Sequence, residues 1–598
     1  MGRIGATLLA MTRLALYVRK VLEGARSAAF IWALAWGFIF GLSALDSFAQ
    51  GAGTTRITDF SAPNTDPSGR KSVVKGANAE PVGNGIFHIT KPHVDNYKAD
   101  GTLDTVIEAS ECEFDSRNTH DVWSSKELSM KSVDGKLSLK GIGFHFSVTN
   151  SHLTISNNVE AVIRRQALMN AATQSSSAGT NEFLRVTSDS LDRAIDSLTF
   201  KGRVHVIDAQ GEIRCEILNV KLDEQNTPDL IEAQEDVILT QKETEAHGKR
   251  ALYSRKSGLL RLYESTRWRM GDREGESQVL ILDRTNNTLR AETKVKLTLP
   301  TALLSTNATR ETGSRVSTNR LTITADTFDY APTNNTTKKP IAIFNGDVHA
   351  VDPQASLDCE LLTIFFGDSN RVMRAVADRN VVIRRPDGFI DGVRAVFENE
   401  EITVPSNPTW KLKENTGSAE TLVFNPRTRE IRGLKNVQME IPVATQTNFL
   451  MTATADRGTT NTRPATGTNI LVVTSEYFTN KDNIATFANH VRASEPRGQI
   501  DANKIELHLN SSNRVERVVA NGDVILTEDK TQAIGQRADY DVLTGIISLT
   551  GTPRVMADNR EIIAREFIVD RNKNQFQPLA PFHIEIKNIK GLAKPLPK

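Results

Sequence analysis

The chain has 598 residues, more than one ordinary hydrophobic core accommodates, so roughly three to five domains are expected. Lys and Arg number 73 and Asp and Glu 72, for a net charge of +1, which disfavours nucleic-acid binding through a broadly basic surface. The chain is 39% hydrophobic but only 6% aromatic, and its many Val, Ile, Leu and Thr residues favour half-buried strands.

Residues 1–49 have the pattern of an export signal. Several Arg and Lys residues precede an uncharged run, Ser27–Leu45, and Ser47-Phe48-Ala49 supplies the small residues that signal peptidase reads before Gln50. The same run is long enough to span a bilayer as an uncleaved anchor, with its basic flank inside the cell. Both alternatives place the rest of the chain outside the cytoplasm.

The remaining chain is divided by polar, Ser/Thr/Asn-rich stretches near 171–181, 305–319 and 445–469. Residues 50–71 are similar in composition and predict a flexible leader. We expect a divergent β unit at 72–170, three further β units at 182–302, 320–442 and 470–590, and a short basic tail at 591–598.

A short motif recurs in this chain. Phe344–Asp352 reads Phe-Asn-Gly-Asp-Val-His-Ala-Val-Asp, and residues 200–208 and 520–526 have the same form. In each copy apolar residues alternate with others after a glycine. This pattern is typical of a strand with one buried face that is entered through a turn or bulge.

The spacing between motifs shows that larger units repeat. Two valines and an aromatic residue follow one another at identical intervals in each of three units, without an insertion. These sets are Val204, Val237 and Tyr253; Val348, Val381 and Phe397; and Val491, Val524 and Tyr540. Constant spacing over three copies indicates a tandem repeat, and a divergent first unit is expected at the end of an array.

Secondary structure is expected to be almost entirely β. The pairs Asp134-Gly135, Asp387-Gly388 and Asn157-Asn158 are predicted to form hairpin turns. Cys215 and Cys359 lie at matching repeat positions, where the fourth unit has Ala502. We therefore expect them, with Cys112, to be small core residues rather than disulfide partners.

Motifs of catalysis and cofactor binding are missing from the sequence. It contains no phosphate loop, dinucleotide motif, nucleophile elbow or zinc-type Cys/His cluster, so an enzyme is not expected and we predict no catalytic residue, metal ligand or cofactor. His205 and His349 match between repeats, but each lies between inward positions and is expected to face solvent. Asp208 and Asp352 also match and are interpreted as turn-forming residues. The tryptophans are not expected to recur in register, which argues against a polysaccharide-binding array with aromatic platforms.

The repeated motif, Phe-x-Gly-x-Val-x-Val followed by further alternating strands and Gly-x-x-Ala-x-Tyr, resembles the OstA-like lipopolysaccharide-transport family. This family comprises the LptA, LptC and LptD N-terminal-domain type of periplasmic protein. The resemblance covers roughly residues 196–300, 340–442 and 483–570 of the three later units, and the unit at 72–170 is loosely similar to the LptC variant. It implies tandem, twisted, half-open β-jelly rolls of antiparallel strands, after a hydrophobic N-terminal helix.

The resemblance also implies a function in outer-membrane assembly. The protein would be a periplasmic carrier or bridge between the inner and outer membranes, holding the acyl chains of lipopolysaccharide or a similar glycolipid in an apolar groove. Its partners would be other lipopolysaccharide-transport components at both membranes, docked through strand edges. The candidate groove residues are the alternating apolar positions Val204, Val206, Val237, Leu239, Val348, Val381, Ile383, Val491, Val524 and Leu526.

Two other features bear on this interpretation. Small family members carry a single unit, whereas this chain links several, and we expect no long β-barrel after the fourth unit. The same alternation of apolar residues also fits closed β-sandwiches in a structural or adhesive envelope protein without a lipid ligand. Both functions remain open at the level of the sequence.

Overall fold

The computed structural model describes residues 56–586, apart from 67–68, 165–182, 209–210, 224–226, 284–285, 302–319, 333–338, 368–370, 444–468, 497, 511–513, 529–530, 558–559 and 571–574. The predicted signal or anchor at 1–49 and the tail at 591–598 lie outside the described residues. Within the described ranges, no helix is long and apolar enough to cross a membrane. These ranges form strands throughout, which confirms the all-β prediction.

Contacts divide the chain into two compact units, and the first comprises the chain up to Leu128 together with His145–Ser151. Its strands, two of which continue into the second unit, are β1 (Ile57–Thr65), β2 (Lys71–Gly83), β3 (Ile86–Thr90), β4 (His93–Tyr97), β5 (Leu103–Ala109), β6 (Glu111–Asp115), β7 (Asp121–Ser132) and β8 (Leu137–Ser147).

The second unit comprises Ser129–Phe144 and the chain from His152 onward. Its first strands are β9 (His152–Arg164), β10 (Phe183–Ser188), β11 (Ser190–Arg193), β12 (Ser197–Asp208), β13 (Gly211–Leu222), β14 (Pro228–Gln241), β15 (Thr244–Ser254), β16 (Leu259–Met270), β17 (Arg273–Asp283), β18 (Thr288–Pro300), β19 (Arg320–Ala331), β20 (Ile341–Val351), β21 (Ser356–Phe366), β22 (Val372–Arg385) and β23 (Gly388–Glu398).

The later strands of this unit are β24 (Glu401–Pro405), β25 (Thr409–Leu412), β26 (Asn415–Ser418), β27 (Thr421–Phe424), β28 (Ile431–Val443), β29 (Asn469–Lys481), β30 (Ile484–Glu495), β31 (Gly498–Leu509), β32 (Val515–Glu528), β33 (Thr531–Asp541), β34 (Ile546–Thr550), β35 (Arg554–Ala557), β36 (Arg560–Asp570) and β37 (Gln575–Ile586).

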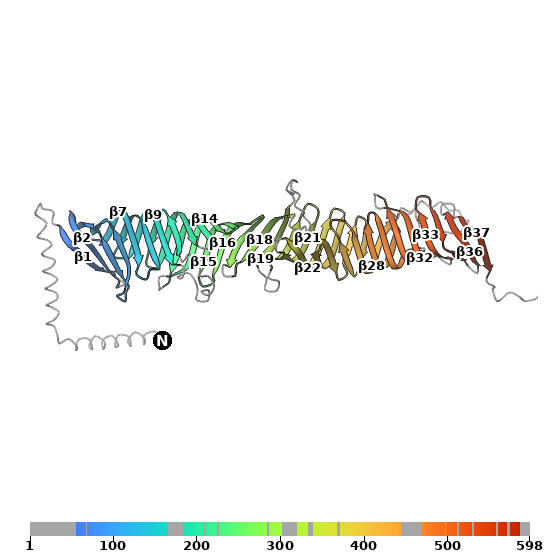
Figure 1. The fold of residues 1–598 in the computed structure, drawn as a ribbon, viewed down its shortest axis with the longest axis horizontal. Helices are drawn as coiled ribbons and strands as arrows, with labels where there is room; N and C mark the ends of the chain where they lie inside the picture. Colours follow the sequence, from blue (N-terminus) through green and yellow to red (C-terminus); the bar gives the residue numbers. More distant parts are fainter. Residues whose placement is uncertain are drawn as a thin grey trace, which may run out of the picture. The chain divides into compact units, whose positions relative to one another are not determined.

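Most strands from β12 to β37 pair antiparallel with the next strand in the chain (Figure 1). Short strands pair side by side at two places: β24 and β25 both pair with β23, β26 and β27 both pair with β28, and β34 and β35 both pair with β33 and with β36. Pairing continues across the predicted unit boundaries. β18 pairs with β19 from Leu289↔Tyr330 to Pro300↔Arg320, and β28 pairs with β29 in the same way. The polar stretches near 305–319 and 445–469 therefore connect paired strands, and the repeats share one continuous ladder of backbone hydrogen bonds.

The predicted flexible leader is wrong for residues 57–65. These residues form β1, which pairs antiparallel with β2 from Ile57↔Ala79 to Thr65↔Lys71. Ile57 and Phe60 are half-buried there, and the Phe60 ring lies 5.8 Å from that of Phe87. Because a polar strand is also stabilised by its backbone ladder, a composition rich in Ser, Thr, Asn and Pro did not reveal it.

A pair of residues with left-handed backbone interrupts every second long strand of the repeats. In the recurring motif this pair is Gly346 (φ +82°) and Asp347 (φ +44°), and the register with β21 shifts at this point. The corresponding pairs are Gly202–Arg203, Glu235–Asp236, Glu264–Ser265, Thr293–Lys294, Arg379–Asn380, Lys435–Asn436, Asn489–His490 and Gly522–Asp523. Each is a β-bulge, which bends the strand. The predicted turn or bulge before the motif is thus confirmed as a bulge within the strand.

The bulges divide each repeat into two arms. In the third repeat, the A arm consists of the segments Arg320–Ala325, Val348–Val351, Ser356–Cys359, Val381–Arg385 and Gly388–Gly392. The B arm consists of Thr327–Ala331, Ile341–Asn345, Leu361–Phe366, Val372–Asp378 and Arg394–Glu398. In the strands without a bulge, buried positions alternate along each arm but skip one residue at the bend, as between Cys359 and Leu362. Both arms therefore present buried side chains to one interior, as expected for a bent, jelly-roll-like unit.

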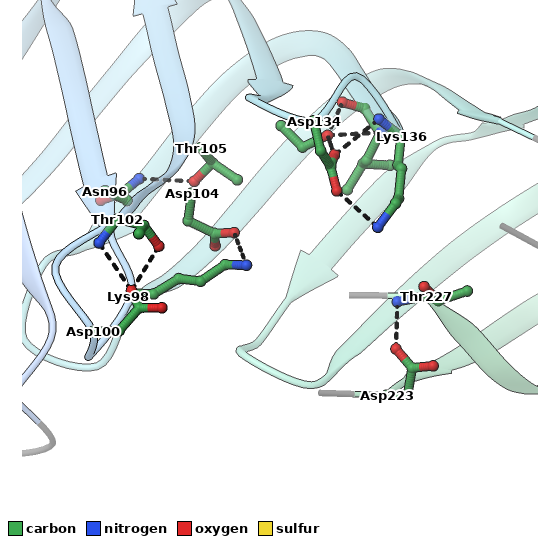
Figure 2. Close-up of polar contacts among 12 residues, drawn as sticks. Asn96, Lys98, Asp100, Thr102, Asp104, Thr105, Asp134, Lys136, Asp223 and Thr227 are labelled. Carbon is green, nitrogen blue, oxygen red and sulfur yellow. Dashed lines mark hydrogen bonds and ion pairs between the residues drawn. The ribbon is translucent and has the colours of Figure 1, made fainter. Parts of the chain in front are cut away.

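Aspartates close several hairpins (Figure 2). The Asp100 carboxylate accepts hydrogen bonds from the Thr102 amide (2.9 Å) and hydroxyl (2.6 Å), and the latter bond is the main cause of its lowered pKa. Asp134 accepts one from the Lys136 amide (3.0 Å), which confirms the predicted turn at Asp134-Gly135. Such side-chain bonds to a nearby amide favour turns.

The predicted hairpin at Asn157-Asn158 is wrong. Both residues lie within β9, where Asn158 has a φ of +53° and directly precedes buried Val159. The segment before them pairs with β11 and the segment after them pairs with β10. This Asn-Asn pair therefore marks a bend between two arms, because Asn tolerates the left-handed conformation in a bulge as well as in a turn.

The three cysteines are buried and free, as predicted. Cys215 pairs with Val204 and Cys359 with Val348, and Ala502 pairs with Val491 at the same position of the fourth repeat. Burial raises the pKa of the Cys215 thiol to about 12 and that of Cys359 to about 11. These thiols are core residues.

Two tryptophans recur in register, contrary to the expectation from the sequence. Trp268 pairs with Gly275 in the second repeat as Trp410 pairs with Gly417 in the third, and both indoles are buried. Each indole covers its glycine: a Cβ on Gly275 would lie 2.1 Å from Trp268, and one on Gly417 would lie 2.4 Å from Trp410. They pack within the core, so they are not exposed platforms for a polysaccharide.

Candidate functional site between the two arms

The ten predicted groove residues are all buried inside the repeats. Six of them directly follow a bulge pair, namely Val204, Val237, Val348, Val381, Val491 and Val524. They lie at the bend itself, where the arms meet, and each is at most 1% exposed. Val206, Leu239, Ile383 and Leu526 lie two positions farther along the A arm.

A cavity of about 780 Å³ lies between the arms of the third repeat. From the A arm it is lined by Leu321, Ile323, Ala350, Leu357 and Ile383, and from the B arm and its extension by Leu362, Ile364, Val372, Ala375, Ala377, Ala395, Phe397, Ile402 and Phe424. Its volume is typical of small-molecule sites, which range over roughly 300–1,000 Å³. The apolar walls suit an alkyl chain.

Polar groups gather where strands end around this cavity. Arg385, Asp387, Glu400, Arg427 and Arg429 contribute to its lining. Arg385 pairs with Asp387 (Nε–Oδ1, 3.1 Å), and Arg427 pairs with Glu400 (Nη1–Oε2, 3.5 Å). The site therefore combines an apolar interior with a charged rim.

Cations also bridge the two arms. The Arg385 guanidinium, at the end of the A arm, lies 4.6 Å from the centroid of the Phe424 ring on β27, which extends the B arm. Arg273 at the start of β17 lies 4.5 Å from the ring of Phe366 in the same manner. Cation–π contacts of this kind contribute roughly 0.5–2 kcal/mol. The contact of Arg385 with Phe424 joins the arm ends beside the cavity, since both residues line it.

The repeat-equivalent polar residues lie on the outer face, as predicted. His349 is exposed and pairs with Asp358, and His205 is half-buried, with its Nε2 2.5 Å from Glu212. The Asp208 carboxylate accepts a hydrogen bond from the Gly211 amide (2.9 Å), and Asp352 accepts one from the Ala355 amide (2.8 Å), which confirms both as turn residues. Across the part of the chain that the structure describes, no group of three His, Cys, Asp or Glu residues is placed to hold a metal ion.

Of the ten predicted residues, Ile383 alone is among those that line the cavity. Val348 and Val381 lie at the bend between the arms instead and do not line the cavity. The prediction missed the small residues Ala350 and Ala375, because a search for large alternating apolar side chains passes over the positions that leave space. Alanines at inward positions of both arms were the available signal.

Comparison with known protein families gives a match over two segments. Residues 185–288 and 473–575 match the family described as LptA/(LptD N-terminal domain) LPS transport protein. Both segments are therefore similar to domains of this family. They correspond to the second and fourth repeats, and the third repeat has the same strand spacing and the same bulges. The predicted recognition as an OstA-like transport protein in tandem repeat is confirmed.

Among solved structures, the chain is similar to LptH from Pseudomonas aeruginosa, described as the LptA homologous periplasmic component of the conserved lipopolysaccharide transport device. The two share 14% identity, the similarity covers 20% of this chain and 95% of LptH, and the TM-score is 0.18. Comparison with curated proteins gives no match. The assignment of the family therefore rests on the two matched segments.

Proposed function

We propose that this protein is a periplasmic carrier of lipopolysaccharide or a similar glycolipid, which holds acyl chains between the A and B arms of its repeats and bridges the two membranes. The observation that supports this most directly is the apolar cavity between the arms of the third repeat, flanked in sequence by two segments that match the transport family. The carrier forms and breaks no covalent bond. Its task is to remove the cost of exposing acyl chains to water, about 0.8 kcal/mol per methylene.

Partner docking is proposed to occur through strand edges. Within the described residues, β37 pairs with β36 alone, and its side chains Phe576, Phe582 and Ile584 are exposed. An unpaired edge with apolar side chains can accept a strand from another protein. In this proposal the second strand belongs to another lipopolysaccharide-transport component at the inner or outer membrane.

The alternative is a structural or adhesive envelope protein with closed, filled β-sandwiches. In that case every repeat would be packed to the density of a protein interior, with few voids larger than a water molecule. The cavity of about 780 Å³ favours the carrier over this alternative.

Site-specific photo-crosslinking in the full-length chain tests the carrier function. The photoreactive residue p-benzoylphenylalanine would replace Ile383, Leu239 or Leu526 on the A-arm wall of the third, second and fourth repeats, and His349 or His205 on the outer face as controls. After irradiation in cells, adducts would be purified and their lipid identified by mass spectrometry. Lipopolysaccharide adducts at the wall positions alone would support the carrier. Equal capture at both faces, or none at the wall, would overturn it.

A further inference from the structure

We propose that the third repeat contains a dedicated binding site for an anionic amphiphile, which the neighbouring repeats lack. An alkyl chain would occupy the cavity, and its phosphate or carboxylate head would contact Arg429. This inference rests on the proposed lipid-carrier function and assigns a ligand class to one unit within it.

The first observation is a difference in wall volume at one repeat-equivalent position. Ala375 on β22 pairs with Ile364 on one side and Phe397 on the other. In the second repeat the same position, between Val220 and Tyr253, is Ile231. In the fourth repeat, the position between Leu507 and Tyr540 is Val518. The third repeat therefore lacks a branched side chain that the other two have at this position.

The paired aromatic position differs in the same direction. Phe397 replaces Tyr253 and Tyr540, so the third repeat has no phenolic hydroxyl beside Ala375. A buried hydroxyl must be hydrogen-bonded, and its removal leaves a wall that an alkyl chain covers without a desolvation cost. Both substitutions make the third cavity larger and more apolar.

The second observation is the positive charge at the rim of the cavity. Arg385 ends β22 where the second and fourth repeats have Gln241 and Glu528. Arg427 and Arg429 lie in the turn from β27 to β28, where the sequence of the second repeat has Thr285 and Asn287 and that of the fourth has Asn572 and Asn574. Three arginines thus replace neutral or acidic residues at the rim of the third repeat.

The rim also contains acidic groups, and their partners determine which cation is available. Asp387 pairs with Arg385, and Glu400 pairs with Arg427. The Asp352 carboxylate accepts bonds from the amides of Gln354 (2.7 Å) and Ala355 (2.8 Å). Arg429 lines the cavity and has no carboxylate partner among the described residues. Its guanidinium is therefore the group that can form a bidentate bond with an incoming phosphate or carboxylate.

Together these features select for a ligand with both an alkyl chain and an anionic head. A free anion would leave the apolar cavity empty, and a neutral amphiphile would leave Arg429 without a counter-ion. The wall and the rim contribute separately to the affinity, so each can be tested by a variant that leaves the other intact.

Binding of tetradecyl phosphate to the purified full-length chain, measured by isothermal titration calorimetry, tests the proposal. Tetradecyl maltoside and inorganic phosphate serve as the neutral and the chain-free probes. Arg429→Gln should weaken tetradecyl phosphate roughly tenfold or more, the value of one charge-assisted hydrogen bond, and leave tetradecyl maltoside unchanged. Inorganic phosphate alone should not bind at comparable concentrations.

Ala375→Ile tests the wall, because Ile occupies the equivalent position of the second repeat. Each methylene displaced from the cavity lowers affinity about fourfold, so loss of two or three should weaken both amphiphiles roughly 15- to 60-fold. Ala375→Val, which introduces the residue type of the fourth repeat, should have a smaller effect in the same direction, and it replaces the Ile variant if that variant does not fold. The matched variant Ile231→Ala should strengthen the binding of tetradecyl maltoside by the second repeat.

The outcomes separate this inference from the carrier function. Unchanged binding of tetradecyl phosphate to both the Arg429 and the Ala375 variants would overturn the dedicated site, even where crosslinking captures lipid in the other repeats. Binding of inorganic phosphate with the same affinity as the amphiphile would overturn the amphiphile and leave an anion site. Absence of lipid capture in every repeat would instead remove the carrier function itself.

Discussion

Gly346 at the bend of β20 is expected to be one of the least replaceable residues of the third repeat. Its φ of +82° lies in the left-handed region, and a Cβ there would lie 2.3 Å from Asp326 Oδ2 and 2.9 Å from Asp326 Cβ. For Gly346→Ala, the left-handed conformation costs roughly 1–2 kcal/mol. Displacing Asp326 on β19 adds roughly 1–3 kcal/mol of overpacking. The expected loss of local stability is therefore about 2–5 kcal/mol.

Gly271→Ala is the matched control. Gly271 also has a positive φ (+57°), but no atom lies within 4 Å of the position that its Cβ would take. The control should lose the conformational contribution alone, about 1–2 kcal/mol. In the double variant Asp326→Gly/Gly346→Ala, removal of the Asp326 side chain should relieve the collision. A coupling energy of about 1–3 kcal/mol is expected from this cycle.

Hydrogen exchange followed by mass spectrometry is the appropriate assay, because a long repeat array does not unfold as one cooperative transition. Peptides covering β19 to β21 report the local opening free energy, and a tenfold faster exchange corresponds to about 1.4 kcal/mol. Exchange in β19 to β21 should accelerate at least 30-fold in Gly346→Ala, and exchange near Gly271 about tenfold in its control. Equal acceleration in the two variants would refute the reasoning that the bend excludes a side chain.

Three further predictions concern the core and the arm ends. Gly275→Ala and Gly417→Ala should each destabilise their strands by roughly 1–3 kcal/mol and shift tryptophan fluorescence, since the new Cβ would overlap the indoles of Trp268 and Trp410; an unchanged spectrum would contradict the packing. Because burial raises the pKa of Cys215 to about 12, its thiol should resist alkylation in the folded chain at pH 8. Its contribution to stability, complete below about pH 9, should be lost as the pH rises from about 9 to about 12, where the unfolded thiol ionises first. Urea unfolding at about pH 8 and pH 10 checks this, and Cys215→Ala, which introduces the residue type of Ala502 in the fourth repeat, should reduce the dependence without removing it, because burial also raises the pKa of Cys112 and Cys359. Phe424→Leu should weaken the contact of Arg385 by roughly 0.5–2 kcal/mol and speed exchange in β22 and β27, whereas Phe389→Leu at an exposed position should not.

The repeat and its strands could be predicted from the sequence because they depend on local patterns. Alternation of Val348 and Ala350 about His349 specifies a buried face, and the constant offsets place equivalent strands in equivalent positions. The bend was only partly predictable. Glycine marks it at Gly202, Gly346 and Gly522, but Arg379–Asn380 and Thr293–Lys294 adopt the same conformation without a glycine. There the backbone ladder on both sides imposes the bulge on residues whose own preference is weak.

The residues beside the cavity could not be identified by asking which features recur, because the site lies where the third repeat departs from the others. Val348 and Val381 recur faithfully since every repeat needs a filled bend, and for that reason they do not distinguish one repeat from another. Ala375 and Arg429 do not recur, and each becomes meaningful only after the strand register shows that Ile231 and Asn287 occupy the same places. In a tandem array, residues that are the same in every repeat therefore indicate the fold. Residues that differ between repeats indicate where one unit can bind a different ligand from its neighbours.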